Sequence, residues 1–105
     1  MSDKVKTLDK DTFADAIKSG ICFVKFTSPT CGPCRKYAEN FDTFATNNSS
    51  VKCFTIDATD NLDIAMEYEI RQVPVTMIFK DGKEKSKLQG IQSVEKLQSD
   101  YEDFS

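Results

Sequence analysis

Hydrophobic positions along the chain alternate between a spacing typical of strands and a spacing typical of helices. Apolar and β-branched runs predict strands at 5–8, 21–26 and 51–57. Residues 73–90 predict a hairpin whose two strands meet at an Asp81-Gly82 turn. The run at 21–26 is apolar at four successive positions, which is typical of an interior strand with both faces covered.

Apolar residues three and four positions apart predict helices at 9–20, 33–47 and 61–70, and a last helix follows Ser93. Strands connected through helices should be parallel, with right-handed crossovers, whereas the hairpin strands should be antiparallel. The pattern therefore predicts one α/β domain over residues 1–105, with a mixed sheet and helices on both faces.

Helix boundaries and inward faces follow from local residue types. We expect Asp9 or Asp11 to cap the first helix, Gly20 to end it, and Asp60 to cap the third. The third helix offers four side chains to the core: Leu62, Ala65, Met66 and Tyr68.

Composition narrows the class of protein. Of the 105 residues, 39% are hydrophobic and 30% charged, the net charge is −3, and the lysines and arginines form no basic block. These values are typical of a globular domain that binds no nucleic acid. The sequence begins without an apolar leader and has no apolar run long enough to span a membrane. We therefore expect a cytoplasmic monomer with no membrane partner.

The four cysteines divide into two pairs by context. Cys22 and Cys53 fall in strand-like runs and should be buried, whereas Cys31 and Cys34 enclose the turn residues Gly32 and Pro33. A C-x-x-C motif indicates either zinc or redox chemistry. Structural zinc usually needs four ligands, and this chain has a single such motif and no histidine, so we expect no metal site.

Redox chemistry suits the place of the motif between a strand and a helix. The free N–H groups and positive end of a helix favour a thiolate at Cys31, which makes it the attacking nucleophile. Pro33 fits the first helical turn, since no hydrogen bond is lost there, and Gly32-Pro33 shapes the turn. Cys34, one turn into the helix, should be more buried and should resolve the mixed disulfide.

Along its whole length the chain resembles the thioredoxin family. The resemblance rests on "TCGPCRK", on "RQVPVTMIFKDGK" and on "KLQG", which ends at Gly90. It implies a thioredoxin fold, with a central five-stranded sheet in the order 1-3-2-4-5 flanked by four helices. It also implies a cis proline at Pro74 beside the cysteines, with Val73 offering its backbone to a substrate. A trans proline at a strand start is the alternative.

The same resemblance implies a function. Such a protein reduces protein disulfides as an electron carrier in cell redox homeostasis, binds no cofactor, and receives electrons from NADPH through a thioredoxin reductase. Its partners are that reductase and disulfide-containing client proteins. Two alternatives stay open: a more oxidising, isomerase-like protein, and a binding or redox-sensing module without turnover. A reduction potential near about −270 mV, rather than about −120 to −180 mV, would separate reductase from oxidant.

The sequence departs from the family pattern at three positions. Thr30 replaces the usual tryptophan before the first cysteine, which gives a smaller and more polar substrate-docking surface. Lys25 replaces a buried aspartate that handles the proton of the resolving cysteine, and Cys53 replaces the lysine beside it. Lys25 could be a neutral amine that accepts the Cys34 proton, or an ammonium that lowers a thiol pKa. Alternatively its stem carries the charge to the surface and the residue has no role in the reaction.

Overall fold

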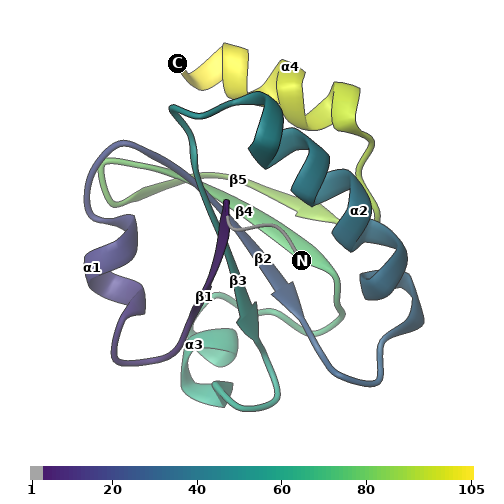
Figure 1. Ribbon diagram of the computed structural model, residues 1–105. Helices are drawn as coiled ribbons and strands as arrows, with labels where there is room; N and C mark the ends of the chain where they lie inside the picture. Colours follow the sequence, from purple (N-terminus) through teal and green to yellow (C-terminus); the bar gives the residue numbers. More distant parts are fainter. Residues whose placement is uncertain (1–3) are drawn as a thin grey trace.

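The computed structural model describes residues 4–105 and contains the elements in the predicted order (Figure 1). The strands are β1 (Val5–Leu8), β2 (Ile21–Thr27), β3 (Lys52–Asp57), β4 (Val75–Lys80) and β5 (Lys83–Gln89). The helices are α1 (Phe13–Ile17), α2 (Gly32–Asn47), α3 (Leu62–Glu67) and α4 (Val94–Phe104).

The five strands form one mixed sheet in the order β1-β3-β2-β4-β5. β3 is parallel to both β1 and β2, whereas β4 is antiparallel to β2 and β5. This confirms the strand order implied by the family resemblance. β2 lies at the centre, where Phe23 is in register with Cys53 on one side and Ile78 on the other. The five inner residues of β2 are all buried, as the apolar run predicts.

Helices cover both faces of the sheet (Figure 1). α1 and α3 lie on one face, over a core that includes Phe13, Val24 and Phe79. α2 and α4 lie on the other, over a core that includes Phe23 and Leu97. Since side chains of a strand alternate between faces, the three inner strands β2, β3 and β4 each contribute to both cores.

The hairpin turn has the predicted residues in the predicted conformation. Asp81 has φ 53° and Gly82 has φ 85°, the two positive values that a tight hairpin turn requires. The Asp81 carboxylate also accepts the backbone N–H of Gly20 at 2.9 Å, which ties the turn to the start of β2.

The first helix is shorter than predicted, and its predicted cap is wrong. α1 begins at Phe13 with Thr12 at the N-cap, where no side chain caps the helix. The Asp9 carboxylate instead accepts the N–H groups of Asp11 and Thr12 at 2.9 and 3.0 Å. These bonds fold the preceding residues into a turn, because aspartate competes locally for backbone donors. The helix ends at Ile17, before the predicted stop at residue 20.

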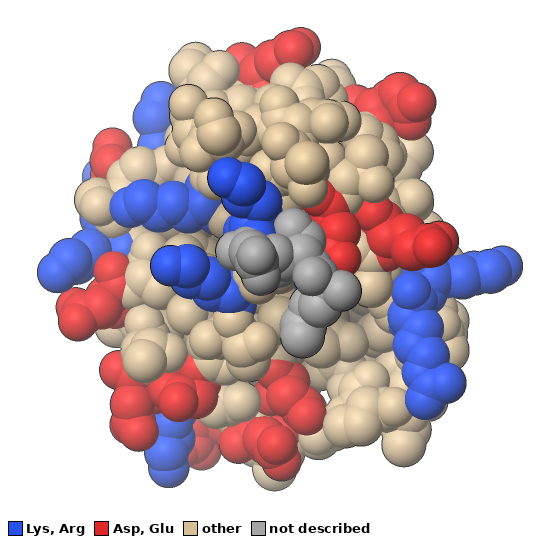
Figure 2. Space-filling model, viewed as in Figure 1, with Lys and Arg blue, Asp and Glu red and all other residues tan. Residues whose placement is uncertain are grey.

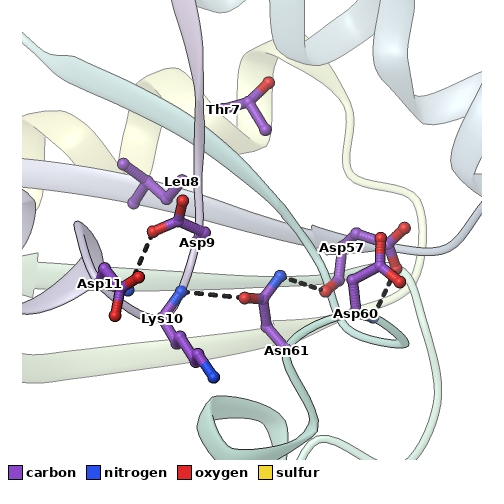
Figure 3. Close-up of a pocket in the computed structure, with 8 residues that line it drawn as sticks. All are labelled: Thr7, Leu8, Asp9, Lys10, Asp11, Asp57, Asp60 and Asn61. Atoms are coloured by element: carbon purple, nitrogen blue, oxygen red, sulfur yellow. Dashed lines mark hydrogen bonds between the residues drawn. The ribbon is translucent and has the colours of Figure 1, made fainter.

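The third helix also corrects two predictions. Its N-cap is Asn61 rather than Asp60, and the side chain makes no capping bond. Asn61 instead braces two loops (Figure 3): its Oδ1 accepts the N–H of Lys10 and its Nδ2 donates to the Asp57 carbonyl, both at 2.9 Å. The helix is therefore rotated so that Leu62 and Met66 face solvent. Leu62 is 61% exposed and Met66 is 74% exposed.

The inward face of α3 is therefore different from the predicted one. Ala65 is buried and Tyr68 packs against the core, as predicted, but Ile64 takes the place expected for Leu62 and Met66. Tyr68 contacts Phe13 with ring centroids 5.5 Å apart.

Candidate active site

The two cysteines of the C-x-x-C motif lie where β2 gives way to α2. Cys31 is the N-cap residue of the helix, and the backbone N–H of Cys34 donates to its Sγ at 3.1 Å. Pro33 lies in the first turn, as predicted. A sulfur at this place receives hydrogen bonds and the positive helix end, both of which favour its negative charge.

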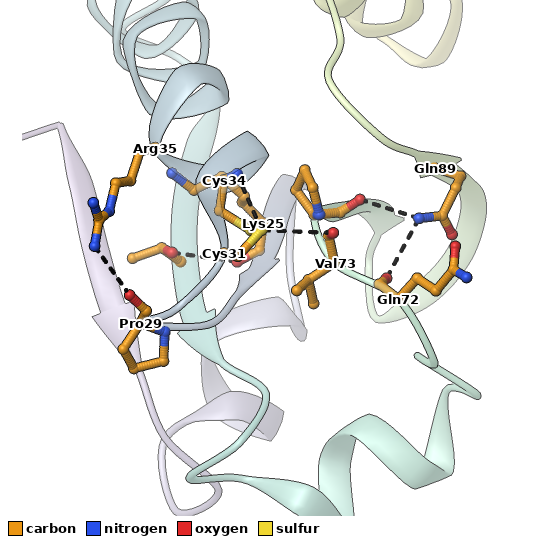
Figure 4. Close-up of a disulfide and its surroundings, with 10 residues drawn as sticks. Lys25, Pro29, Cys31, Cys34, Arg35, Gln72, Val73 and Gln89 are labelled. Atoms are coloured by element: carbon orange, nitrogen blue, oxygen red, sulfur yellow. Dashed lines mark hydrogen bonds between the residues drawn. A yellow bond between two sulfur atoms is a disulfide. The ribbon is translucent and has the colours of Figure 1, made fainter.

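Cys31 and Cys34 form a disulfide, with Cα atoms 5.2 Å apart (Figure 4). The two sulfurs differ in access: Cys34 is 3% exposed, whereas Cys31 is only partly buried. This confirms the predicted difference in burial. An incoming group would therefore meet Cys31 first, with Cys34 protected behind it.

A loop from the other side of the sheet lies against the disulfide. The Val73–Pro74 peptide is cis, as the family resemblance implies, so the alternative of a trans proline is wrong. The Val73 carbonyl oxygen lies 3.6 Å from Cys31 Sγ (Figure 4). Gln89 Nε2 reaches over this loop, 3.4 Å from the Gln72 carbonyl and 3.5 Å from the Pro74 carbonyl. A group docked on Val73 is thus next to the accessible sulfur.

The segment before Cys31 presents a small polar surface. Thr30 is exposed where the family pattern has tryptophan. Arg35 folds back over the segment and donates from Nη2 to the Pro29 carbonyl at 3.4 Å (Figure 4). The approach to Cys31 is therefore more open on this side than it would be with tryptophan at position 30.

Lys25 is buried in the central strand, with 6% of its surface exposed. Its Nζ lies 5.3 Å from the centre of the Phe41 ring and 5.9 Å from that of Tyr37. Burial lowers the pKa of the amine below its ordinary value, and the nearby Asp42 carboxylate opposes that change. Such burial disfavours the alternative in which the stem carries a fully hydrated ammonium to the surface.

Tyr37 and Thr76 form a buried polar pair that the sequence reasoning missed. Their hydroxyl oxygens are 2.6 Å apart, and both residues are 0% exposed. In the sequence, Tyr37 is one of the apolar residues whose spacing predicts the helix at 33–47, and nothing indicates a role for Thr76. The spacing in the sequence could have indicated this pair. Tyr37 follows Cys34 by one helical turn and Thr76 follows Pro74 by two positions, so both should lie on the side of their element that faces the active site.

The other two cysteines are free and buried, as predicted. Burial raises the pKa of Cys22, and it raises the pKa of Cys53 to about 12. Both groups therefore remain protonated thiols near neutral pH, and a thiol is a weak nucleophile. In the part of the chain that the structure describes, no three Cys, Asp or Glu side chains gather in a way that could hold a metal ion.

Asp57, at the end of β3, has a local role. The hydroxyl and N–H of Thr59 donate to its carboxylate at 2.6 and 2.8 Å, and the Asp60 N–H donates at 3.4 Å. The hydroxyl bond is the largest cause of the lowered pKa of Asp57. Asp9 and Asp57 both line the pocket shown in Figure 3, and the carboxylate of each holds loop backbone in place.

Comparison with known proteins gives the same family at the level of sequence. The thioredoxin family profile matches residues 4–103. A thioredoxin of Staphylococcus epidermidis is 33% identical over 94 residues, which covers 89% of each chain. A Drosophila melanogaster thioredoxin domain-containing protein 5 homolog is 30% identical over 101 residues, but the chain spans only 24% of that longer protein.

Solved structures give the same fold. A mutant thioredoxin from Halobacterium salinarum superposes with a TM-score of 0.90 at 23% identity, covering 99% of this chain and 94% of that one. Spinach chloroplast thioredoxin f superposes with a TM-score of 0.87 at 26% identity, covering 95% and 92%. The disulfide and the cis-proline loop described above thus lie in a chain that matches these proteins over nearly its whole length.

Proposed function

The chain belongs to the thioredoxin family and is a thiol–disulfide oxidoreductase that reduces protein disulfides, and we propose that Cys31 attacks while Cys34 resolves. One observation carries this assignment. Cys31 caps α2 and is accessible, whereas Cys34 is 3% exposed behind it. Gly32 and Pro33 form the turn that keeps the two sulfurs within bonding distance.

The proposed cycle balances as two thiol–disulfide exchanges. The Cys31 thiolate attacks one client sulfur, the client disulfide breaks, and the other client sulfur leaves as a thiolate. Cys34 then loses its proton and attacks Cys31 Sγ, which breaks the mixed disulfide and forms Cys31–Cys34. The client gains two electrons and takes two protons from water.

Client proteins should dock beside the cis-proline loop. The Val73 backbone lies next to Cys31 Sγ and could pair with an extended client segment. We propose that Pro74, which follows Val73, and the exposed Thr30, which precedes Cys31, contact the same segment. A groove opens beside Val73 with an apolar floor that includes Ala58 and Ile70. Its rim includes the exposed Leu62, which offers further apolar contact to a client.

The source of electrons, the cellular compartment and the oligomeric state are also part of the proposed function. We propose that electrons come from NADPH through a thioredoxin reductase, and that the protein is a cytoplasmic monomer serving electron transport and redox homeostasis. On the face in Figure 2, basic and acidic side chains are interspersed, which suits protein partners better than nucleic acid. Within residues 4–105, no helix has the length and apolar character needed to cross a bilayer.

Replacing Cys34 by serine tests the assignment of roles. The variant should attack client disulfides but fail to resolve them, so covalent mixed disulfides with Cys31 should accumulate. Non-reducing electrophoresis and mass spectrometry of trapped species would detect them and identify the attached residue. A binding module without turnover would instead release its partners as readily as before.

Lys25 is proposed as the group that receives the Cys34 proton, directly or through water. Burial lowers the pKa of the amine and so favours the neutral form, which can accept a proton. The alternative is a permanent ammonium that stabilises the thiolate and makes the disulfide more oxidising. The two versions predict different outcomes when the amine is removed.

Lys25→Met keeps the length of the side chain and removes the amine. We expect resolution to slow by about a hundredfold near neutral pH, because a general base contributes at least that much. The loss should shrink as pH rises, since other bases then deprotonate Cys34, and the reduction potential should be unchanged. Rapid-mixing kinetics and a redox titration against glutathione measure the two quantities.

Two further results bear on Lys25. Because the unfolded chain binds the Lys25 proton more tightly than the folded one, the free energy of unfolding of the wild type should rise with pH, from the lowered pKa towards the ordinary value of 10.5. Lys25→Met should lack that slope.

Lys36→Met, which removes an exposed lysine of α2, is the matched control. A more negative potential in Lys25→Met would favour the ammonium version, and no change in rate or potential would make Lys25 a bystander.

A further inference from the structure

The Tyr37–Thr76 hydrogen bond joins the two elements that carry the proposed active-site groups. Tyr37 belongs to α2, one turn beyond Cys34, and residues three apart share a helix face. Thr76 belongs to β4, two positions beyond Pro74, and residues two apart share a strand face. The face of α2 that bears Cys34 is therefore bonded to the face of the strand that continues from Pro74.

The Tyr37–Thr76 bond is buried, and neither hydroxyl has a second partner to replace it among the described residues. Both residues are 0% exposed, and among residues 4–105 each hydroxyl has the other as its only hydrogen-bond partner. Breaking the bond would leave two buried hydroxyls unpaired, which costs more than the bond contributes when formed. The Tyr37 ring also packs on Phe41, with centroids 5.7 Å apart.

The central strand completes the arrangement. Lys25 is in register with Thr76, and its Nζ lies over the rings of Tyr37 and Phe41. The Tyr37–Thr76 hydrogen bond therefore lies where β2, β4 and the first turns of α2 meet. Lys25, the proton acceptor proposed above, lies beside it. The bond links α2 to β4 just beyond the disulfide.

We infer that the Tyr37–Thr76 bond is a positioning element for the resolving step, holding the helix that bears Cys34 against the strand that follows the docking proline. The inference rests on the proposed roles of Cys31 and Cys34. When a client is bound to Cys31 and Val73, Cys34 must meet Cys31 Sγ in line with the bond that breaks. Reaction rates of this kind depend steeply on the alignment of the reacting atoms. Attack by Cys31 on a client disulfide does not involve Cys34, so its rate should not depend on how Cys34 is held.

An aromatic disulfide, dithiobis(nitrobenzoate), separates the two steps. Attack by Cys31 releases one coloured thionitrobenzoate, and resolution by Cys34 releases the second, so rapid mixing with the reduced protein should show two phases. Cys22 and Cys53 are buried thiols and should contribute only slowly. Cys34→Ser should show the first phase alone; if it showed both, the proposed function would fail before the present inference was tested.

Tyr37→Phe and Thr76→Val each remove one hydroxyl and keep the shape of the side chain. Each should slow the second phase roughly fivefold, the effect of losing one buried hydrogen bond from alignment. The first phase should be unchanged, and the slowing should be the same at every pH, in contrast to the loss of a general base at Lys25. Thr76→Ser, which keeps the hydroxyl, should retain the wild-type rate.

The double variant separates positioning from stability. Tyr37→Phe with Thr76→Val leaves no unpaired hydroxyl, so its stability should recover towards wild type. Resolution should stay as slow as in the single variants, because the bond is still missing. The control is Tyr101→Phe, which removes a phenol hydroxyl from a ring that packs on Phe23 in the same core.

Two results would overturn the inference. One is a second phase of wild-type rate in both single variants. The other is a second phase that recovers together with stability in the double variant, which would mean that the bond matters only for folding. A slowing in Tyr101→Phe equal to that in Tyr37→Phe would have the same consequence.

Discussion

Replacing Cys31 by serine should abolish disulfide reduction, lowering the rate by roughly a thousandfold or more. The hydroxyl that remains has no accessible anionic form near neutral pH, whereas the cysteine sulfur accepts a hydrogen bond from Cys34 N–H at the positive end of α2. Insulin reduction with a chemical dithiol as electron source measures the loss. The fold should persist without the Cys31–Cys34 disulfide, because the reduced wild-type protein lacks that bond too and the exchange alters a single atom at a partly buried position.

Thiol alkylation gives the matching test on the wild-type protein. Near neutral pH the reduced protein should be modified first at Cys31, and Cys31→Ser should lose this fast reaction. Cys22 and Cys53 should react slowly, because burial raises the pKa of both thiols. Preferential labelling of either buried cysteine, or residual reductase activity in Cys31→Ser, would contradict the assignment.

Phe23→Ala should have the largest effect on stability. Phe23 is 0% exposed at the centre of the sheet, with its ring centroid 4.8 Å from that of Phe44 and 6.4 Å from that of Tyr101. Truncation removes apolar contact and leaves a cavity among rings that cannot collapse fully, at a cost of about 3–5 kcal/mol. That is a large share of the roughly 5–15 kcal/mol by which domains are stable.

Urea unfolding of the oxidised protein would measure the change in the free energy of unfolding. Met66→Ala is the control, because Met66 is 74% exposed and should change stability by no more than about 0.5 kcal/mol. A cost below about 1 kcal/mol for Phe23→Ala would mean that the core around α2 and α4 repacks far more easily than its geometry indicates.

Much of the fold could be predicted from the sequence because its signals are local. The apolar run at 21–26 requires cover on both faces, and the turn at Asp81-Gly82 requires positive φ, so these elements were predicted correctly. The start and phase of α1 and α3 could not be predicted in the same way. They depend on Asp9 and Asn61, whose side chains bond to loops instead of capping the helix that follows.

In the candidate site, too, some features follow from local sequence and others depend on the packing of distant segments. The place of Cys31 and Cys34 at a strand–helix junction is a local property, and their unequal burial follows from it. The environment of Lys25 is not local, because it combines rings from α2 with the Asp42 carboxylate. The Tyr37–Thr76 pair joins residues from distant parts of the chain, and only the packing of α2 on β4 brings them together.

The two outer strands of the sheet bear on how the protein behaves at high concentration. Among residues 4–105, β1 and β5 each have one side without a neighbouring strand, and an unpaired edge of this kind invites other chains to add to it and aggregate. Both edges carry exposed lysines, Lys6 on one and Lys83 and Lys85 on the other. A second copy adding to either edge would bring like charges together, which is unfavourable. Edge-to-edge addition of further copies is thus disfavoured, which would help this oxidoreductase to remain dispersed when it is abundant.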